Sequence, residues 1–274
     1  MNSQLNNSRK EFEKLGNLYA PSEQVAINQE IIENVTCYWF NPKEKVNTNR
    51  LIIYLHGGCF VLGSIHSHQA LVSHLSEQLA LPILFVEYSL APEKPFPAAV
   101  NEIEKVYKQM LARDPEKNII LMGDSAGGGL AISIVSAFNK ENIKSPVYLV
   151  MLSPWIDLSC NNDSLLRNKD SDPILTKKAL QDYASMYIND NNLSEANPIE
   201  NMKGRYPPTL ILVSAAEILL DDSKSIYSKI ASDQQKTKLS IYDNQNHVWM
   251  LANIHSEESK KAIREIKEFI QPGQ

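Results

Sequence analysis

The sequence predicts an α/β protein with a mostly parallel central sheet and helices on both of its faces. Short apolar runs rich in β-branched residues recur along the chain, and each is followed by a stretch in which apolar residues recur at helical spacing. Runs of this kind are typical of parallel strands covered by helices on both sides. With 274 residues, 43% of them hydrophobic, the chain can bury a large core. Ligands of such sheets bind at the carboxyl ends of the strands.

The individual elements follow from this alternation. The predicted parallel strands are residues 50–55, 82–88, 118–122, 147–152, 209–213 and 238–242, and residues 30–40 predict one antiparallel edge strand. The predicted helices between and after them are residues 66–80, 98–112, 126–139, 223–232 and 257–270.

Two segments do not fit the alternation. Residues 1–28 are polar with weak helical spacing, and residues 158–205 are long, rich in asparagine and helical in pattern only around 176–188. A long insert inside a compact domain is uncommon unless it covers a site. We therefore expect a small helical cap made by an N-terminal segment, residues 1–45, which includes the edge strand, and by an insertion at about 158–205 in a catalytic domain of residues 46–274.

Composition excludes several function classes. The 27 basic and 32 acidic residues are well mixed, so nucleic acid is not expected as a partner. No apolar run is long enough to span a bilayer and the first residues lack a secretory signal, so we expect no membrane contact and a cytoplasmic location. Three cysteines without a CxxC pair indicate neither a disulfide framework nor a zinc site, and we expect no metal and no cofactor.

The glycines mark two places where the backbone needs freedom. Only 10 of the 274 residues are glycine, and seven of these fall within residues 57–63 and 123–129. The second window contains Gly-Asp-Ser-Ala-Gly, which matches G-x-S-x-G between an apolar strand and a helix. That setting is the one a nucleophile elbow requires, and it makes Ser125 the candidate nucleophile. An ordinary glycine-rich turn is the alternative interpretation.

The first window predicts an oxyanion site. His56-Gly57-Gly58-Cys59 ends the strand at 50–55, and glycines there let the chain turn its amides inward. Acyl transfer develops a negative oxygen that backbone N–H groups stabilise. The expected donors are Gly58, Cys59 and Ala126, which follows the nucleophile.

His247 is the candidate general base. In a chain with a nucleophile elbow the acid and the histidine follow the serine, which leaves His247 and His255. His247 follows the last predicted strand, whereas His255 lies beside the start of the closing helix. We interpret His56 as support for the glycine turn.

Three carboxylates follow the strand at 209–213. Glu217 is the first and has the shortest route to a histidine on the next loop, so it is the candidate acid. Asp221 is the alternative acid, with a helix N-terminal charge as its other interpretation. We expect Asp222 to be solvated.

Over residues 50–270 the chain resembles the hormone-sensitive-lipase-like branch of the α/β-hydrolases, the bacterial family IV esterases. The resemblance rests on HGGCFVLGS, YSLAPEKPFPAAV, GDSAGG, AEILLDD and NHVW, which occur in the order found in that family. The 30-residue separation of acid and histidine in the family favours Glu217. The chain departs from the family at Cys59, where a glycine is usual, at Glu217 and Ile218, where aspartate and proline are usual, and at Ser89, where an arginine is common. Serine there removes an ion pair with Glu93 or with a neighbouring carboxylate.

The resemblance implies an α/β-hydrolase fold and a serine carboxylesterase that hydrolyses short-chain acyl esters, acetyl to about hexanoyl, through an acyl-enzyme. A small-molecule ester is the expected partner, and a homodimer is expected by analogy only. An amidase, deacetylase or formamidase with the same triad, and a non-enzymatic small-molecule receptor on the same fold, remain alternatives. Candidates for the substrate pocket are Trp155, Leu165, Leu166, Tyr183 and Tyr187, for each of which core packing is the alternative.

Overall fold

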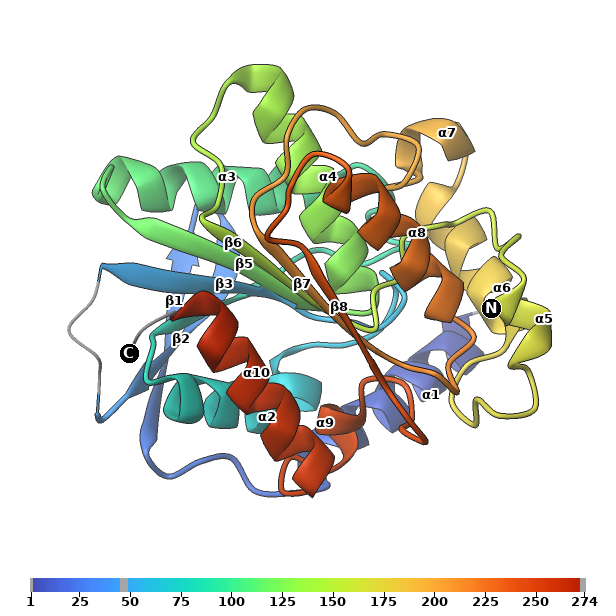
Figure 1. Ribbon diagram of the computed structural model, residues 1–274, viewed down its shortest axis with the longest axis horizontal. Coiled ribbons are helices and arrows are strands. Elements are labelled where there is room, and N and C mark those ends of the chain that lie inside the picture. The colour runs from blue at the N-terminus through green and yellow to red at the C-terminus, as the bar shows by residue number, and fades with distance from the viewer. Residues whose placement is uncertain (1, 45–48, 272–274) are drawn as a thin grey trace.

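An eight-stranded sheet runs through the computed structural model, which describes residues 2–44 and 49–271 (Figure 1). The strand order is β1-β2-β4-β3-β5-β6-β7-β8, and β3 to β8 are all parallel to one another. The predicted mostly parallel α/β architecture is confirmed. The strands are β1 (Val25–Ile32), β2 (Val35–Pro42), β3 (Arg50–Leu55), β4 (Ile83–Glu87), β5 (Asn118–Asp124), β6 (Tyr148–Leu152), β7 (Thr209–Ser214) and β8 (Lys238–Tyr242).

The N-terminal edge of the sheet corrects one prediction. The single strand expected at 30–40 is the middle of a hairpin, in which β1 pairs antiparallel with β2 and β2 pairs antiparallel with β4. Its two-residue turn is Glu33-Asn34, with φ of 51° and 65°. Two consecutive residues at positive φ match the twist of a tight hairpin, but glutamate at the first of them is not a recognised sequence signal.

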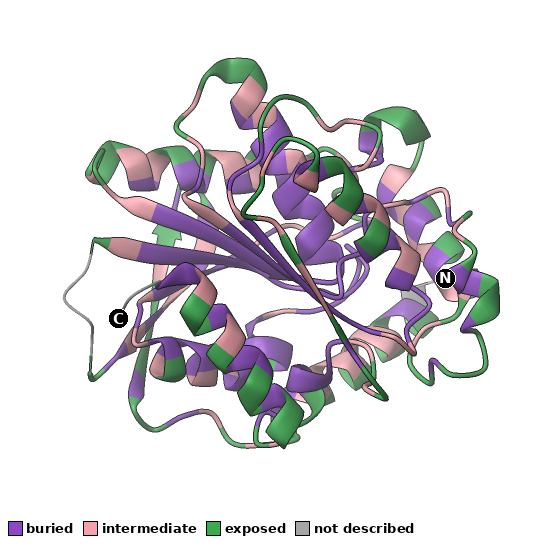
Figure 2. Cartoon of the chain, in the orientation of Figure 1, coloured by how far each residue is buried: buried purple, intermediate pink, exposed green. Residues whose placement is uncertain are grey.

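Helices cover both faces of the sheet, and a separate apolar core fills each side. One face carries α2 (Ile65–Leu79) and α10 (Glu257–Ile270), and the other carries α3 (Ala98–Arg113), α4 (Ala126–Glu141) and α8 (Leu220–Ala231) (Figure 1). The central strands are buried along nearly their whole length (Figure 2). Burial on both faces explains why these strands read as continuous apolar runs in the sequence.

The remaining helices gather beyond the carboxyl ends of the parallel strands (Figure 1). They are α1 (Asn2–Glu13) and the 3-10 helix η1 (Lys14–Asn17) from the N-terminus, α5 (Ser164–Arg167), α6 (Lys177–Ile188) and α7 (Leu193–Ala196) from residues 158–205, called the cap segment below, and α9 (Trp249–Ala252). Within the described ranges no helix is both long and apolar enough to cross a membrane.

Helix α1 is fastened to the loops that follow β3 and β4. The Arg9 guanidinium donates to the carbonyl oxygens of Val61 and Ala91, each at 2.9 Å, and forms a two-pronged ion pair with Glu93 at 2.7 and 2.8 Å. Glu93 therefore has an arginine partner in Arg9, although position 89, where an arginine is common in the family that the chain resembles, is a serine. The partner comes from a residue 84 positions earlier in the chain.

Candidate active site

Ser125 sits at a tight turn between β5 and α4. Its φ of 50° and ψ of −119° lie outside the regions that most residues occupy. Glycine is required on both sides, because a Cβ on Gly123 would lie 2.6 Å from the Gly127 carbonyl and one on Gly127 would lie 1.9 Å from the Leu55 carbonyl oxygen. The close packing of strand and helix thus holds the serine in a strained conformation at the carboxyl edge of the sheet.

Three side chains from the ends of β5, β7 and β8 form a hydrogen-bonded chain. His247 Nε2 lies 3.0 Å from Ser125 Oγ, and His247 Nδ1 lies 2.6 Å from Glu217 Oε2. All three residues are on loops or turns that leave parallel strands in the same direction. The structure brings together the serine, the histidine and the acid that the sequence singled out, and Glu217 rather than Asp221 contacts the imidazole.

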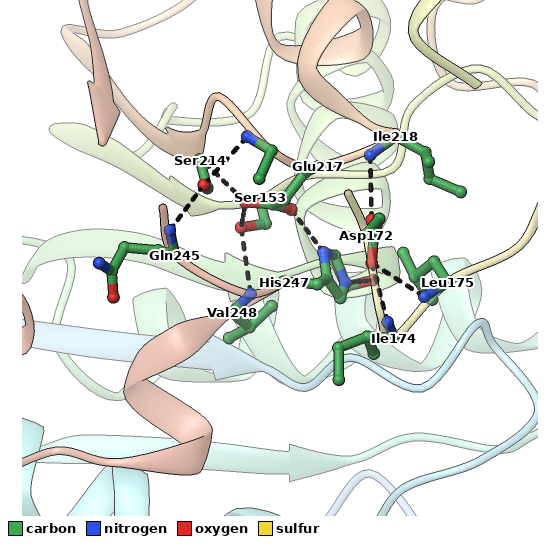
Figure 3. A network of polar contacts seen from close by, with 12 residues as sticks. Ser153, Asp172, Ile174, Leu175, Ser214, Glu217, Ile218, Gln245, His247 and Val248 are labelled. Atoms are coloured by element: carbon green, nitrogen blue, oxygen red, sulfur yellow. Dashed lines mark hydrogen bonds and ion pairs between the residues drawn. The ribbon is translucent and has the colours of Figure 1, made fainter. Parts of the chain in front are cut away.

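Glu217 is held in place by two further donors. Its Oε1 accepts the hydroxyl of Ser153 at 2.8 Å and the backbone N–H of Ser214 at 2.7 Å (Figure 3). The Ser153 hydroxyl oxygen also accepts the N–H of Val248 at 3.3 Å, so it joins the acid to the residue after His247. Ser153 was not predicted from the sequence, in which its only signal is its place at the end of a parallel strand.

The environment of His247 favours its protonated form. Burial by itself would lower the pKa of the imidazole, but the hydrogen bond and charge of Glu217, with the charges of Asp172 and Asp124, outweigh it and raise the pKa above 6.5. A histidine whose basicity is raised in this way can accept a proton from a hydroxyl at 3.0 Å.

The loop after β3 presents its backbone to Ser125. Gly58 and Cys59 line the cavity beside the serine, with φ of 116° and 55°, and Ala126 is the first residue of α4. Within the described ranges, the N–H groups of Gly58 and Cys59 donate to no protein acceptor. Both remain free to donate to a substrate oxygen next to Ser125.

The buried carboxylate of Asp124 holds the loop after β3 in place. Asp124 Oδ1 accepts the N–H of Gly57 at 3.0 Å and the hydroxyl of Tyr54 at 2.8 Å, and its Oδ2 lies 3.4 Å from Nε2 of His68. Burial opposes ionisation of Asp124, but His68 and Tyr54 outweigh it and lower the pKa of the carboxyl group. His56 is fully buried with Nδ1 2.7 Å from the Gly57 carbonyl oxygen, and burial lowers its pKa to about 3, as suits a structural imidazole.

The cavity beside Ser125 is small and mainly apolar, with a volume of about 110 Å³. Its walls come from both ends of the chain and from the cap segment. Besides the serine, the histidine and the loop residues named above, it is lined by Phe12, Leu15, Asp124, Ile174, Leu175, Asn246, Val248, Leu251 and Ala252.

A family model for the alpha/beta hydrolase fold matches residues 52–251 of the chain. The match covers well over half of the sequence and includes all three members of the hydrogen-bonded chain. The chain belongs to the α/β-hydrolase family.

Relatives place this hydrolase within the hormone-sensitive-lipase-like branch. A protein of Acinetobacter venetianus named esterase is 33% identical over 231 residues, which are 83% of the chain and 76% of that protein. An acetyl-hydrolase of Streptomyces hygroscopicus is 30% identical over 94% of the chain and 85% of its own length. The crystal structure of an esterase from the bacterial hormone-sensitive lipase family matches with a TM-score of 0.91 at 30% identity, over 97% of the chain and 90% of its own.

The two aspartates after Glu217 have other partners in this hydrolase. Asp221 accepts the N–H of Ser164 and pairs with Arg167, each at 2.9 Å, and does not contact His247. Asp222 corrects a prediction: it is 1% exposed rather than solvated. Burial raises the pKa of Asp222 to about 7. The N–H groups of Ile156 and Asp157 donate to its Oδ2 and act in the opposite direction, lowering the pKa. Asp221 therefore attaches the cap segment to α8, and Asp222 attaches the two residues just before that segment, Ile156 and Asp157.

None of the five aromatic and aliphatic residues expected in the pocket lines the cavity. Trp155, Leu165 and Tyr187 are buried in the core, and Leu166 is exposed. Tyr183 lies in a separate groove against α1. Trp155 and Tyr187 instead pack against Phe60, with ring centroids at 5.4 and 4.0 Å. Trp155 and Tyr187 lie in the core because the chain turns back into it after Ser153, and there they support the loop that carries Cys59.

Proposed function

We propose that this chain is a serine carboxylesterase that hydrolyses short-chain acyl esters, with Ser125 as nucleophile, His247 as general base and Glu217 as the acid. The observation that carries the proposal is the chain of contacts from Ser125 Oγ to His247 Nε2 at 3.0 Å and from His247 Nδ1 to Glu217 at 2.6 Å, beside an apolar cavity. Relatives named esterase and acetyl-hydrolase support the reaction class.

In the first half-reaction, Ser125 Oγ attacks the ester carbonyl carbon while His247 Nε2 takes the hydroxyl proton. The carbonyl π electrons move to the oxygen, which accepts hydrogen bonds from the N–H groups of Gly58, Cys59 and Ala126. Collapse of the tetrahedral intermediate breaks the bond to the alkoxy oxygen, which leaves with the proton from His247. The product is an alcohol and a serine ester.

In the second half-reaction, water attacks the serine ester and gives a proton to His247 Nε2. The second tetrahedral intermediate releases the carboxylic acid, and the proton returns to Ser125 Oγ. Throughout, Glu217 accepts a hydrogen bond from the Nδ1–H of His247 and stabilises the imidazolium that forms twice in each cycle.

The size of the cavity supports short acyl chains. The cavity beside Ser125 has a volume of only about 110 Å³. Small acyl groups fit within it, and longer chains must extend past Ile174, whose side chain is 57% exposed. A crystal structure of EstE5 soaked with p-nitrophenyl butyrate matches this fold with a TM-score of 0.90 at 32% identity.

The test is turnover by the purified protein of p-nitrophenyl esters of increasing chain length. We expect hydrolysis of the acetate and butyrate and a decline beyond the hexanoate, with Ser125→Ala reducing activity to background. No turnover of either short ester, or equal turnover by the alanine variant, would refute the proposal. Faster turnover of the matching p-nitroanilides would favour an amidase, and binding of an ester without turnover would favour a receptor.

We further propose that residues 1–45 and the cap segment act together as the cap over a catalytic domain of residues 46–274. Phe12 and Leu15 from one part, and Ile174 and Leu175 from the other, line the same cavity, which supports this division. The homodimer, the cytoplasmic location and the absence of a metal or cofactor stay predictions from the sequence.

A further inference from the structure

The carboxylate of Asp172, in the cap segment, accepts hydrogen bonds from three backbone N–H groups close to the active site. Asp172 Oδ1 accepts from Ile174 at 2.9 Å and from Leu175 at 3.0 Å, and its Oδ2 accepts from Ile218 at 3.0 Å (Figure 3). The side chain is only 7% exposed. Because Ile218 directly follows Glu217, Asp172 connects the cap segment to the acid loop, residues 214–218.

The residues that Asp172 holds form part of the cavity wall. Ile174 and Leu175 both line the cavity that contains Ser125. Their N–H groups bind the same carboxylate oxygen, which fixes the turn that presents the two side chains. The other oxygen of that carboxylate binds the acid loop, so the position of the wall is set relative to Glu217.

Two neutral side chains reinforce the attachment. Asn168 Nδ2 donates to the carbonyl oxygens of Ala215 at 2.9 Å and Glu217 at 2.7 Å, and Ser171 Oγ donates to that of Ala216 at 2.9 Å. Asn168, Ser171 and Asp172 together bind four consecutive residues of the acid loop. Of the three, only Asp172 brings a negative charge.

We propose that Asp172 is a positioning residue that couples the wall of the substrate cavity to the acid loop, so that it sets the acyl-chain preference. The proposal rests on the proposed esterase function. The negative charges of three carboxylates act on the imidazole: Glu217, which is hydrogen-bonded to it, Asp172 in the cap segment, and Asp124, which precedes the nucleophile. Burial lowers the pKa of His247 and these three charges raise it.

The test is Asp172→Asn, which keeps the shape of the side chain and removes its charge. An asparagine has a single acceptor oxygen, so it cannot hold both the cavity wall and Ile218. We expect kcat/KM for p-nitrophenyl butyrate to fall roughly tenfold and that for the acetate to fall less, because the longer chain contacts more of the wall. With one negative charge fewer, the pKa of His247 falls, and the acid limb of kcat/KM moves to lower pH.

Asp170→Asn is the matched control, because Asp170 is exposed and two residues away. It should leave the chain-length profile and the acid limb unchanged. The proposal is overturned if Asp172→Asn equals this control in both measurements. Titration of the His247 imidazole by NMR, with the resonance assigned from its loss in His247→Gln, gives the pKa without turnover. It therefore decides the charge effect even if the wild type hydrolyses no ester.

A second pair of variants tests the attachment if Asp172→Asn does not fold. Ile218→Pro removes the N–H that donates to Asp172 Oδ2 and leaves the carboxylate in place. Ile218→Ala also removes the isoleucine side chain, but it keeps that N–H. A higher KM for the butyrate in the proline variant than in the alanine variant supports the attachment, and equal KM values overturn it. The acid limb should be the same in both.

Discussion

Replacing Glu217 by glutamine should leave the site folded and give His247 the wrong tautomer. Oε1 of Glu217 accepts the N–H of Ser214 at 2.7 Å and the hydroxyl of Ser153 at 2.8 Å. A backbone N–H cannot turn into an acceptor, so the amide oxygen of the glutamine must take that position. Its NH₂ group then faces His247 Nδ1, which must accept, and the proton moves to Nε2.

An imidazole protonated at Nε2 cannot take the proton of Ser125. The same exchange of the acid for its amide in a serine protease triad lowers kcat by about 10⁴, or about 5 kcal/mol. We expect a loss of this order here, because Glu217 is 1% exposed and no water can replace its charge. The assay is kcat/KM for p-nitrophenyl butyrate, with thermal melting to show that the variant is folded.

Asp221→Asn is the matched control, since it removes the same charge from a side chain four residues away. Asp221 binds Arg167 and Ser164 near the surface, and its loss should change kcat/KM by less than about fivefold. If Glu217→Gln keeps more than about one tenth of wild-type activity, the tautomer argument is wrong. A greater loss in Asp221→Asn would move the assignment of the acid.

Three further outcomes can be measured. His247 must be neutral to act as a base and its pKa is raised, so the acid limb of kcat/KM should have its midpoint above the pKa of an ordinary histidine. A midpoint at or below that of an ordinary histidine contradicts the environment described. Arg9→Ala should free α1, lowering stability by about 1 to 2 kcal/mol, which melting measures, and raising KM, while Lys10→Ala on the same helix should do neither. Burial raises the pKa of Cys59 to about 12, so small thiol reagents should inactivate the protein slowly at neutral pH and faster at higher pH. Cys59→Gly should abolish this inactivation. Inactivation that survives the substitution would point to Cys160 or another thiol.

The parallel part of the sheet and the residues at its carboxyl edge could be predicted because local pattern determines them. Each strand from β3 to β7 is buried on both faces and reads as an apolar run, whereas the edge strand β8 has fewer apolar residues and is partly exposed. Ser125, Glu217 and His247 each follow the carboxyl end of a parallel strand. The hairpin of β1 and β2 was not predictable in the same way, since a Glu-Asn turn looks like the middle of one strand.

The supporting residues could not be found from the sequence because their roles depend on contacts between distant segments. Ser153 reaches Glu217 across 64 residues and Asp172 reaches Ile218 across 46. The exposure of Asp222 was mispredicted for the same reason, because residues 156 and 157 of another loop bury it. Trp155 has the character of a pocket residue, but only the tertiary fold shows that it packs behind the loop of Cys59.

The strained turns around Ser125 impose a compromise on anyone who would engineer this protein. Besides the nucleophile, Cys59, Ser153 and Val248 have φ between 47° and 55°. A left-handed conformation costs an ordinary residue about 1 to 2 kcal/mol and costs glycine almost nothing. Glycine would therefore relieve the backbone at these three positions. Glycine would also remove part of the cavity wall at Cys59 and Val248, and at Ser153 it would remove the hydroxyl that holds Glu217. Substitutions that raise thermal tolerance at these positions would therefore lower selectivity or activity.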